Sequence, residues 1–240
     1  MSKILTFIPA IMAAVTFGGA QEIPYDQIRS GHATYYSWAD GTGNCMLDAL
    51  PDPQYVGALN NTDYNTPVID GKSYPNATLC GTYARVEGNK GSVVIKIVDR
   101  CPDAICTKGH IDLSPEAFAE IDDIEKGYID IKWQLVSIPM SGPISFRYKD
   151  GSSQWWTGIQ VRNHRNPVAR VELYQSGSWE ILPRAQYNYF IAAGGFGSGC
   201  HTLRVTDVFG NELVEQTAIC LGDEIVTQLD WDGKSQFPPP

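Results

Sequence analysis

The chain has 240 residues and a formal net charge of −9, from 18 Lys and Arg against 27 Asp and Glu. This acidic balance argues against nucleic acid and anionic membranes as partners, and it disfavours attraction to acidic pectins. A neutral polymer fits the charge better, and the length suits one large or two small domains.

The first 20 residues have the pattern of a secretory signal peptide. A charged start at Lys3 is followed by an apolar run from Ile4 to Val15 and by small residues that end at Ala20. The apolar run is too short to span a bilayer, and no later run of about 18 apolar residues exists. We therefore expect residues 1–20 to be removed and the mature protein to be secreted into the extracellular space.

Polar and β-branched segments follow. Residues 60–75 are rich in Asn, Asp and Pro and are expected to form a loop. Glycosylation sequons begin at Asn60 and at Asn76, in polar loop sequence. The β-branched run of residues 93–98 predicts a buried strand that ends at Asp99.

A short helix is predicted at residues 115–121. Ser114 is a good N-cap, and Pro115 suits the first helical position because its missing N–H would be unpaired there. Asp112, two residues before the cap, is not needed for capping. A solvated loop acid is the simplest interpretation of such a lone Asp, and a functional acid is the alternative. Residues 128–135 then alternate as a further strand.

Residues 139–143, Pro-Met-Ser-Gly-Pro, give the clearest domain boundary. Beyond them, short alternating strands with hairpin turns near residues 175–178 and 209–211 predict a β-sandwich. We therefore expect a domain at residues 21–138, a linker at 139–143 and a domain at 144–240.

Six cysteines fit an oxidising destination: Cys45, Cys80, Cys101, Cys106, Cys200 and Cys220. If the first four and the last two belong to separate domains, Cys200 pairs with Cys220. Of the three possible pairings among the first four, we favour Cys45–Cys80 with Cys101–Cys106, although the sequence alone does not decide this. The lack of a CxxC pair and the presence of only four His argue against a zinc site.

Two adjacent indoles, Trp155 and Trp156, follow the turn-like sequence Gly151-Ser152-Ser153. Strand alternation would bury one of the two rings, but a twist or bulge after the turn would expose both for stacking on sugar rings. We expect Trp133, Trp179 and Tyr189 to pack instead. The sequence Arg162-Asn163-His164 is interpreted as interdomain or core hydrogen bonding, since no nucleophile at a suitable spacing accompanies it.

In order along the chain, these residues resemble the expansin family, and most closely its bacterial and fungal expansin-like members. Residues 31–36, 98–99, 110–115 and 129–133 resemble the first domain of that family, and residues 151–156, 160–164 and 187–190 resemble the second. The resemblance implies a mainly β fold, with a six-stranded double-psi β-barrel packed against an immunoglobulin-like carbohydrate-binding β-sandwich. It also implies a monomer that loosens plant cell walls by binding cellulose and other neutral wall glucans, with no cofactor and no metal.

The resemblance assigns two sets of site residues. The wall-loosening groove comprises Asp112, Asp99, Thr34 and Tyr36, and the cellulose-binding row comprises Trp155, Trp156, Tyr187 and Lys149. One departure stands in the groove, where Cys101 occupies a position that often holds Tyr in microbial relatives. We expect one sugar-stacking contact there to be lost, or to be replaced, for example by Tyr36 or Trp38.

Hydrolysis of a glycosidic bond normally needs two carboxylates. In the related family-45 glycoside hydrolases, the general acid corresponds to Asp112, and the base follows a Thr-x-Tyr segment. Here Trp38 stands at the expected base position, and Asp40 is the one candidate substitute. We therefore predict a non-hydrolytic protein. The alternatives are a weak endoglucanase or lytic transglycosylase on the same barrel, or a pure carbohydrate-binding or colonisation factor.

Overall fold

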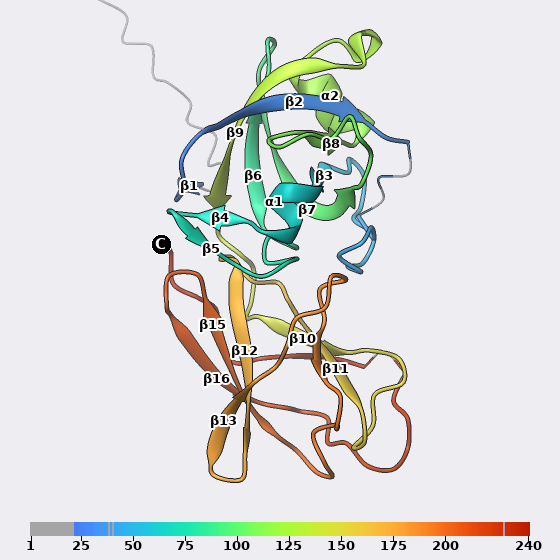
Figure 1. The fold of residues 1–240 in the computed structure, drawn as a ribbon, viewed down its shortest axis with the longest axis vertical. Helices are drawn as coiled ribbons and strands as arrows, with labels where there is room; N and C mark the ends of the chain where they lie inside the picture. The colour runs from blue at the N-terminus through green and yellow to red at the C-terminus, as the bar shows by residue number, and fades with distance from the viewer. Residues whose placement is uncertain (1–21, 38, 40, 228) are drawn as a thin grey trace, which may run out of the picture.

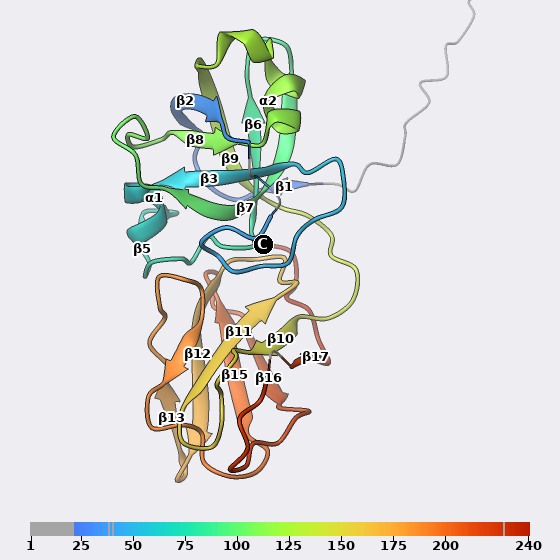
Figure 2. The same cartoon turned by 90° about the vertical axis from the view of Figure 1, so that its right-hand side faces the viewer.

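The computed structural model describes residues 22–37, 39, 41–227 and 229–240. Two β units are stacked end to end, with the N-terminal one above and the C-terminal one below in Figure 1. In both views the C-terminus lies at the level where the two units meet (Figure 2). Among the described residues, no helix is long and apolar enough to cross a membrane.

The N-terminal unit is a closed barrel. Its strands are β1 (Ile23–Pro24), β2 (Arg29–Tyr35), β3 (Val56–Asn60), β6 (Tyr83–Glu87), β7 (Ser92–Cys101), β8 (Ile111–Leu113) and β9 (Ile129–Ser137). The sheet order is β1-β9-β2-β8-β3-β7-β6, and pairing of β6 with β9 closes a ring of six strands. Two parallel pairs, β2 with β8 and β3 with β7, give the double-psi arrangement. The fold prediction is confirmed. Strand β7 contains the strand expected at residues 93–98, and β9 covers the strand expected at residues 128–135 except for its first residue.

A helix and one turn of 3₁₀ helix follow β8 in the barrel unit. Helix α2 (Pro115–Ile121) forms where the sequence predicts it, with the Ser114 hydroxyl accepting the backbone N–H of Ala117. It buries Ala117, Phe118 and Ile121 on one face, so burial of this stripe holds a helix too short to be stable alone. One turn of 3₁₀ helix, η1 (Ile124–Lys126), follows.

The loop expected at residues 60–75 is only partly a loop. It contains α1 (Asn61–Asn65) and a small hairpin of β4 (Val68–Ile69) and β5 (Lys72–Ser73). Asn60 is fully buried, and its side chain accepts the N–H groups of Thr62 and Asp63 at the start of α1. The prediction was wrong here because a polar side chain that suits a loop also caps a helix. The buried Asn60 therefore does not lie in an exposed loop where a glycan could be attached.

The C-terminal unit is a sandwich of two four-stranded sheets. One sheet has the order β14-β11-β10-β17 and the other β13-β12-β15-β16. The strands are β10 (Ser145–Tyr148), β11 (Thr157–Arg162), β12 (Val168–Gln175), β13 (Ser178–Ile181), β14 (Phe190–Ala192), β15 (Thr202–Asp207), β16 (Glu212–Gln216) and β17 (Asp230–Asp232). The hairpin expected at residues 175–178 joins β12 to β13, with Ser176 and Gly177 at positive φ.

Three disulfides join the pairs Cys45–Cys80, Cys101–Cys106 and Cys200–Cys220. The favoured pairing is confirmed. The first two bonds lie in the barrel unit and the third in the sandwich.

Hydrogen bonds and ion pairs join the two units. The carboxylate of Asp48 lies 2.8 Å from Nη1 of Arg147 and 2.8 Å from Nη2 of Arg162. Asn163 donates to the carbonyls of Ser141 and Pro143, on the segment that connects the units. His164 is buried, with Nδ1 2.8 Å from the carbonyl of Asn166. The interpretation of residues 162–164 as interdomain and core hydrogen bonding is confirmed.

Candidate functional site

The register of four barrel strands brings three of the proposed groove residues into one row. Thr34 in β2 is paired with Asp112 in β8, and Asp112 is paired with Ala58 in β3. Ala58 is in turn paired with Asp99 in β7. Residues directly opposite each other in neighbouring strands project from the same face of a sheet. Thr34, Asp112 and Asp99 therefore share one outer face, with the small Ala58 between the two acids.

Asp112 is held by a short chain of hydrogen bonds. The Thr34 hydroxyl donates to Oδ1 of Asp112 at 2.5 Å, and Nε2 of His110 lies 2.9 Å from the same hydroxyl oxygen. Because the single hydroxyl hydrogen of Thr34 points to Asp112, His110 donates its Nε2–H to Thr34. Burial, with a contribution from the charge of His32, lowers the pKa of His110 to about 4. His110 is therefore neutral at pH 7 and fixes the direction of the Thr34 hydroxyl.

The acidity of Asp112 is weakened by its surroundings. Partial burial raises the pKa of the Asp112 carboxyl, the hydrogen bond from Thr34 lowers it, and the charges of Asp103 and Asp99 raise it again, so that the net shift is upward. Since Thr34 binds Oδ1, Oδ2 is the oxygen through which Asp112 can meet a ligand. The carboxyl can thus accept a hydrogen bond from a sugar hydroxyl, or donate one when it is protonated.

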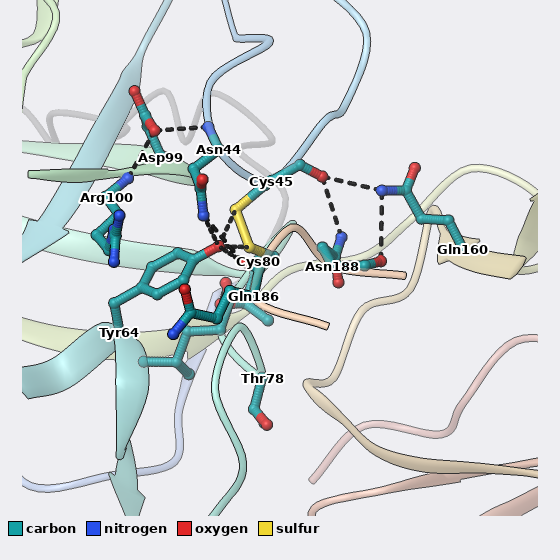
Figure 3. Close-up of a disulfide and its surroundings, with 12 residues drawn as sticks. Asn44, Cys45, Tyr64, Thr78, Cys80, Asp99, Arg100, Gln160, Gln186 and Asn188 are labelled. Carbon is teal, nitrogen blue, oxygen red and sulfur yellow. Dashed lines mark hydrogen bonds between the residues drawn. A yellow bond between two sulfur atoms is a disulfide. The ribbon is translucent and has the colours of Figure 1, made fainter. Parts of the chain in front are cut away.

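Asp99 has a different role in the same row. Its Oδ1 accepts the backbone N–H of Asn44 at 2.5 Å and that of Arg100 at 2.7 Å. The side chain of Asn44 donates to the hydroxyl of Tyr64 and to the carbonyl of Gln186, both at 2.8 Å (Figure 3). Asp99 therefore anchors a barrel loop that reaches the sandwich unit next to Tyr187.

Tyr36 and the departing residue Cys101 lie together. Tyr36 is half-buried and packs against a small cluster of Ala58, Cys101 and Cys106. The Cys101–Cys106 disulfide thus lies beside the residue that separates the two groove acids. Trp38 and Asp40, the residues on which the argument about a second carboxylate rests, lie outside the described residues.

The two indoles stand at a turn rather than along a strand. The backbone N–H of Ser153 donates to the carbonyl of Trp156 at 2.7 Å, which places Gln154 and Trp155 at the tip of the turn. Trp155 is 69% exposed, and Trp156 is half-buried. As expected, the two indoles do not follow strict strand alternation. The reason is that they lie in this turn, and no bulge is involved.

Two glycines make room for the indoles. A side chain at Gly195, where φ is +73°, would place its Cβ 1.9 Å from the carbonyl oxygen of Gln154. A Cβ at Gly158 would lie 3.1 Å from the ring of Trp156 and 3.1 Å from Cβ of Lys149. The backbone at Gly195 therefore supports the turn, and the Trp156 ring lies close over Gly158 beside Lys149.

Tyr187 and Lys149 are also brought together. Nζ of Lys149 lies 5.9 Å from the ring centre of Tyr187 and 5.7 Å from that of Tyr189. Tyr189 is buried, as expected of a packing residue, whereas Tyr187 is half-buried. Since Lys149 also flanks Gly158 with Trp156, these contacts connect Trp156, Tyr187 and Lys149. We call these three residues, together with the exposed Trp155 of the adjoining turn, the platform.

The other two tryptophans expected to pack differ from each other. Trp133 is 1% exposed and donates its indole N–H to the carbonyl of Gly109. Trp179 is half-exposed on β13, where it contacts the ring of Tyr174 and the guanidinium of Arg204. Trp133 is therefore a core residue, and Trp179 packs on the outer surface of its sheet.

The sequence pattern assigned no role in the site to Asn44 or His110. His110 lies two residues before Asp112, a spacing that could have placed it on the same side of a strand. The contacts of Asn44 with Gln186, 142 residues away, left no local signal. Among the described residues, no group of three or more His, Cys, Asp or Glu could hold a metal ion.

Comparison with known proteins gives relatives of the same architecture. A family profile described as lytic transglycolase matches residues 60–133. Expansin-YoaJ of Bacillus subtilis is 34% identical over 212 residues, which cover 88% of each chain. The crystal structure of the expansin of Clavibacter michiganensis superposes with a TM-score of 0.74 at 33% identity, covering 89% of this chain and all of that one. A mutant of that protein, 32% identical to this chain with the same TM-score and coverage, was solved in complex with cellohexaose.

Proposed function

The chain belongs to the expansin family, and from this premise we propose that it is a secreted protein that binds cellulose and loosens the non-covalent packing of cell wall glucans without cutting them. The observation that carries the proposal is the row of Thr34, Asp112 and Asp99 on one outer face of the barrel, joined through Asn44 and Gln186 to the platform. The cellohexaose complex of the Clavibacter relative supports a glucan as the ligand.

The platform would supply most of the free energy of binding to cellulose. Exposed aromatic rings offer flat apolar faces, and stacking on such rings is worth ~1–3 kcal/mol per ring by analogy with nucleic-acid bases. Two or three rings therefore contribute roughly 2–9 kcal/mol, and because association itself costs several kcal/mol, micromolar attachment needs the groove and polar contacts as well. The charge of the whole chain, −9, fits a neutral glucan better than an acidic one.

The groove would act on the attached glucan chain. Cellulose chains adhere through many parallel hydrogen bonds, each of them weak on its own. Oδ2 of Asp112, with its direction fixed by Thr34 and His110, would compete for the hydroxyl groups of one chain while the platform holds the fibril. In this mechanism no covalent bond forms or breaks, and no cofactor takes part.

The proposal extends to the arrangement of the protein. Residues 21–138 and 144–240 would be the groove and the attachment domain, joined by residues 139–143. The protein would act as a monomer outside the cell, after removal of residues 1–20. In this arrangement one glucan chain could contact both the platform and the groove.

Creep of heat-inactivated plant wall under constant load tests the proposal. We expect creep with the unmodified protein and none above background with Asp112→Ala, which should still bind cellulose. The triple variant Trp155→Ala, Trp156→Ala and Tyr187→Ala should lose most of its binding to solid cellulose, with the groove as its remaining site for a soluble glucan. Equal creep with Asp112→Ala and with the unmodified protein would show that the groove has no part in loosening. Binding without creep in both would favour a pure attachment factor.

A second candidate function rests on the family profile described as lytic transglycolase. The matched residues 60–133 include both Asp99 and Asp112. If the barrel cleaves a glycan, soluble fragments should appear when the protein is incubated with amorphous cellulose or with peptidoglycan, and Asp112→Ala should abolish them. A complete lack of soluble fragments with both polymers would exclude this candidate.

A further inference from the structure

An aromatic residue continues the groove row past Thr34. Tyr128 immediately precedes β9, and the β2–β9 ladder ends with Ala33 opposite Ile129. Because the two strands are antiparallel, the same register carried one residue further sets Tyr128 opposite Thr34. The row therefore runs from Asp99 through Asp112 and Thr34 to Tyr128. It crosses four strand spacings, on the order of 19 Å along the sheet.

Tyr128 forms a stacked pair with His32. The ring centres lie 4.8 Å apart, and the ring planes differ by 26°. His32 precedes Thr34 by two residues in β2, so both side chains project from the same face. His32 covers one face of the tyrosine ring, and Tyr128 as a whole residue is still 45% exposed.

The pair is connected to the acid at the centre of the row. The Tyr128 ring centre lies 6.2 Å from that of His110, which donates to Thr34 and so orients the hydroxyl toward Asp112. His32 in turn lies next to Asp130, the residue opposite it in β9, with 2.8 Å between Nδ1 of His32 and Oδ1 of Asp130. The stacking of the two rings holds them together, so a ligand would meet aromatic surface that is already in place.

A polar cavity opens next to the pair. It has a volume of about 580 Å³ and is lined by His32 and Asp130, by Lys132 of the same strand as Asp130, and by Glu87 and Lys108 from two further segments. The negative charges of the two acids and the positive charges of the two lysines cancel in this lining. Such a lining offers hydrogen-bond partners to hydroxyl groups without selecting for a charged ligand, which favours a neutral sugar over a uronic acid.

We propose that Tyr128 and His32 form a sugar-stacking subsite that extends the groove beyond Thr34, and that a neutral glucan chain lying over Asp112 continues across this pair to the cavity. The inference rests on the proposed function and adds to it a binding position in the barrel, separate from the platform. It also gives the groove an aromatic contact at the end opposite Cys101.

The test measures cellohexaose affinity in the full chain after removal of the platform, by Trp155→Ala, Trp156→Ala and Tyr187→Ala. In this background, Tyr128→Ala should weaken binding about tenfold, in line with the loss of one stacked ring. Tyr128→Phe, which keeps the ring, should bind within about twofold of the parent. Tyr174→Ala is the matched control, because Tyr174 is similarly exposed, at 47%, but lies on β12 of the sandwich.

A second measurement does not depend on a substitution. In the unmodified chain, nuclear Overhauser effects should join the ring protons of Tyr128 to protons of bound cellohexaose. Their absence, an unchanged affinity in Tyr128→Ala, or no cellohexaose binding by the platform-deficient chain would each overturn the subsite and leave the proposed function standing. An unmodified chain that binds neither cellohexaose nor cellulose would overturn both.

Discussion

At the scale of single residues, Asp112 owes its properties to two neighbours. Thr34 donates to one carboxyl oxygen, and the buried, neutral His110 fixes the Thr34 hydroxyl. Partial burial and the charges of Asp103 and Asp99 raise the pKa of Asp112 despite the Thr34 bond. An ionised carboxylate in such a place weakens the fold, which is typical of a residue kept for function.

The raised pKa of Asp112 predicts a gain of stability in Asp112→Asn. The folded state holds the proton more tightly than the unfolded state, so the stability present below the ordinary pKa of 3.8 falls as the pH rises through the folded value. Asn cannot ionise and should escape this loss. Because Asp112 is partly solvated, we expect a gain of roughly 1 kcal/mol or less at pH 7, or up to about 4 °C in Tm.

Thermal unfolding followed from pH 3 to pH 8 checks this prediction. The difference between Asp112→Asn and the unmodified chain should vanish below the ordinary pKa of Asp112. Glu125→Gln, an exposed acid in η1, serves as the control and should not change Tm. A lower Tm for Asp112→Asn at pH 7 would mean that the ionised carboxylate stabilises the fold.

At the scale of elements, the platform depends on a turn with tight backbone packing. The turn at residues 153–156 presents Trp155, and Gly195 packs directly against its backbone. Gly195 also has a positive φ, which L side chains rarely adopt. Gly195 thus has no space for a side chain and also has a positive φ. Adding one methyl group at this residue should therefore disturb the turn that carries the indoles.

We therefore predict that Gly195→Ala weakens both the fold and cellulose binding. Its Cβ would collide with the carbonyl of Gln154, and the backbone strain adds to the collision, so a loss of about 1–3 kcal/mol is expected. The neighbouring Gly194→Ala is the matched control, since a Cβ there would meet nothing within 4 Å. Urea denaturation and cellulose pull-down measure the two effects. Similar behaviour of the two variants would refute this role of Gly195.

At the scale of the whole molecule, the interface between barrel and sandwich sets how the proposed groove and the platform lie relative to each other. The Asn44 loop touches Gln186 in the sandwich, and Asp48 binds two arginines that are only 11% and 12% exposed. Burial alone would raise the pKa of Asp48, but the hydrogen bonds and charges of Arg147 and Arg162 bring it below its ordinary value. The ionised form of Asp48 therefore stabilises the joined arrangement.

Removal of this acid should loosen the interface. Asp48→Ala leaves Arg147 and Arg162 with Asp230 as their remaining ion-pair partner in the described part of the chain. Since the Asp48 side chain is 63% exposed, we expect a loss of only about 1 kcal/mol at pH 7, or about 2–4 °C in Tm. A lowered pKa gives stability above the ordinary value of 3.8 that is lost as the pH falls through the folded value, so the difference should shrink below about pH 4.

Calorimetry at pH 7 and at pH 3 measures this difference. Glu125→Ala, an exposed acid of the barrel far along the chain from the interface residues, controls for the loss of one negative charge. An Asp48→Ala protein as stable as the control at pH 7 would show that other contacts alone hold the units together.

Short sequence patterns correctly predicted the strand and the helix whose stability depends mainly on neighbouring residues. The β-branched run of residues 93–98 and the cap at Ser114 define β7 and α2 because strand alternation and helix capping depend on neighbouring residues. The region 60–75 shows the limit of such patterns. Asn60 suits a loop or a helix cap equally well, and because it is buried against the barrel it caps α1.

By itself the sequence determined the β character of the two units and the cysteines available for bridging, because these follow from composition and periodicity along the chain. The members of the groove and of the platform were proposed from its resemblance to expansins. The tertiary structure alone decided which of these residues meet. Strand register set Thr34, Asp112 and Asp99 in one row, and the fold brought His110 to Thr34 and Asn44 to Gln186. Register and packing between distant segments depend on the burial of the whole core, which no local stretch of sequence records.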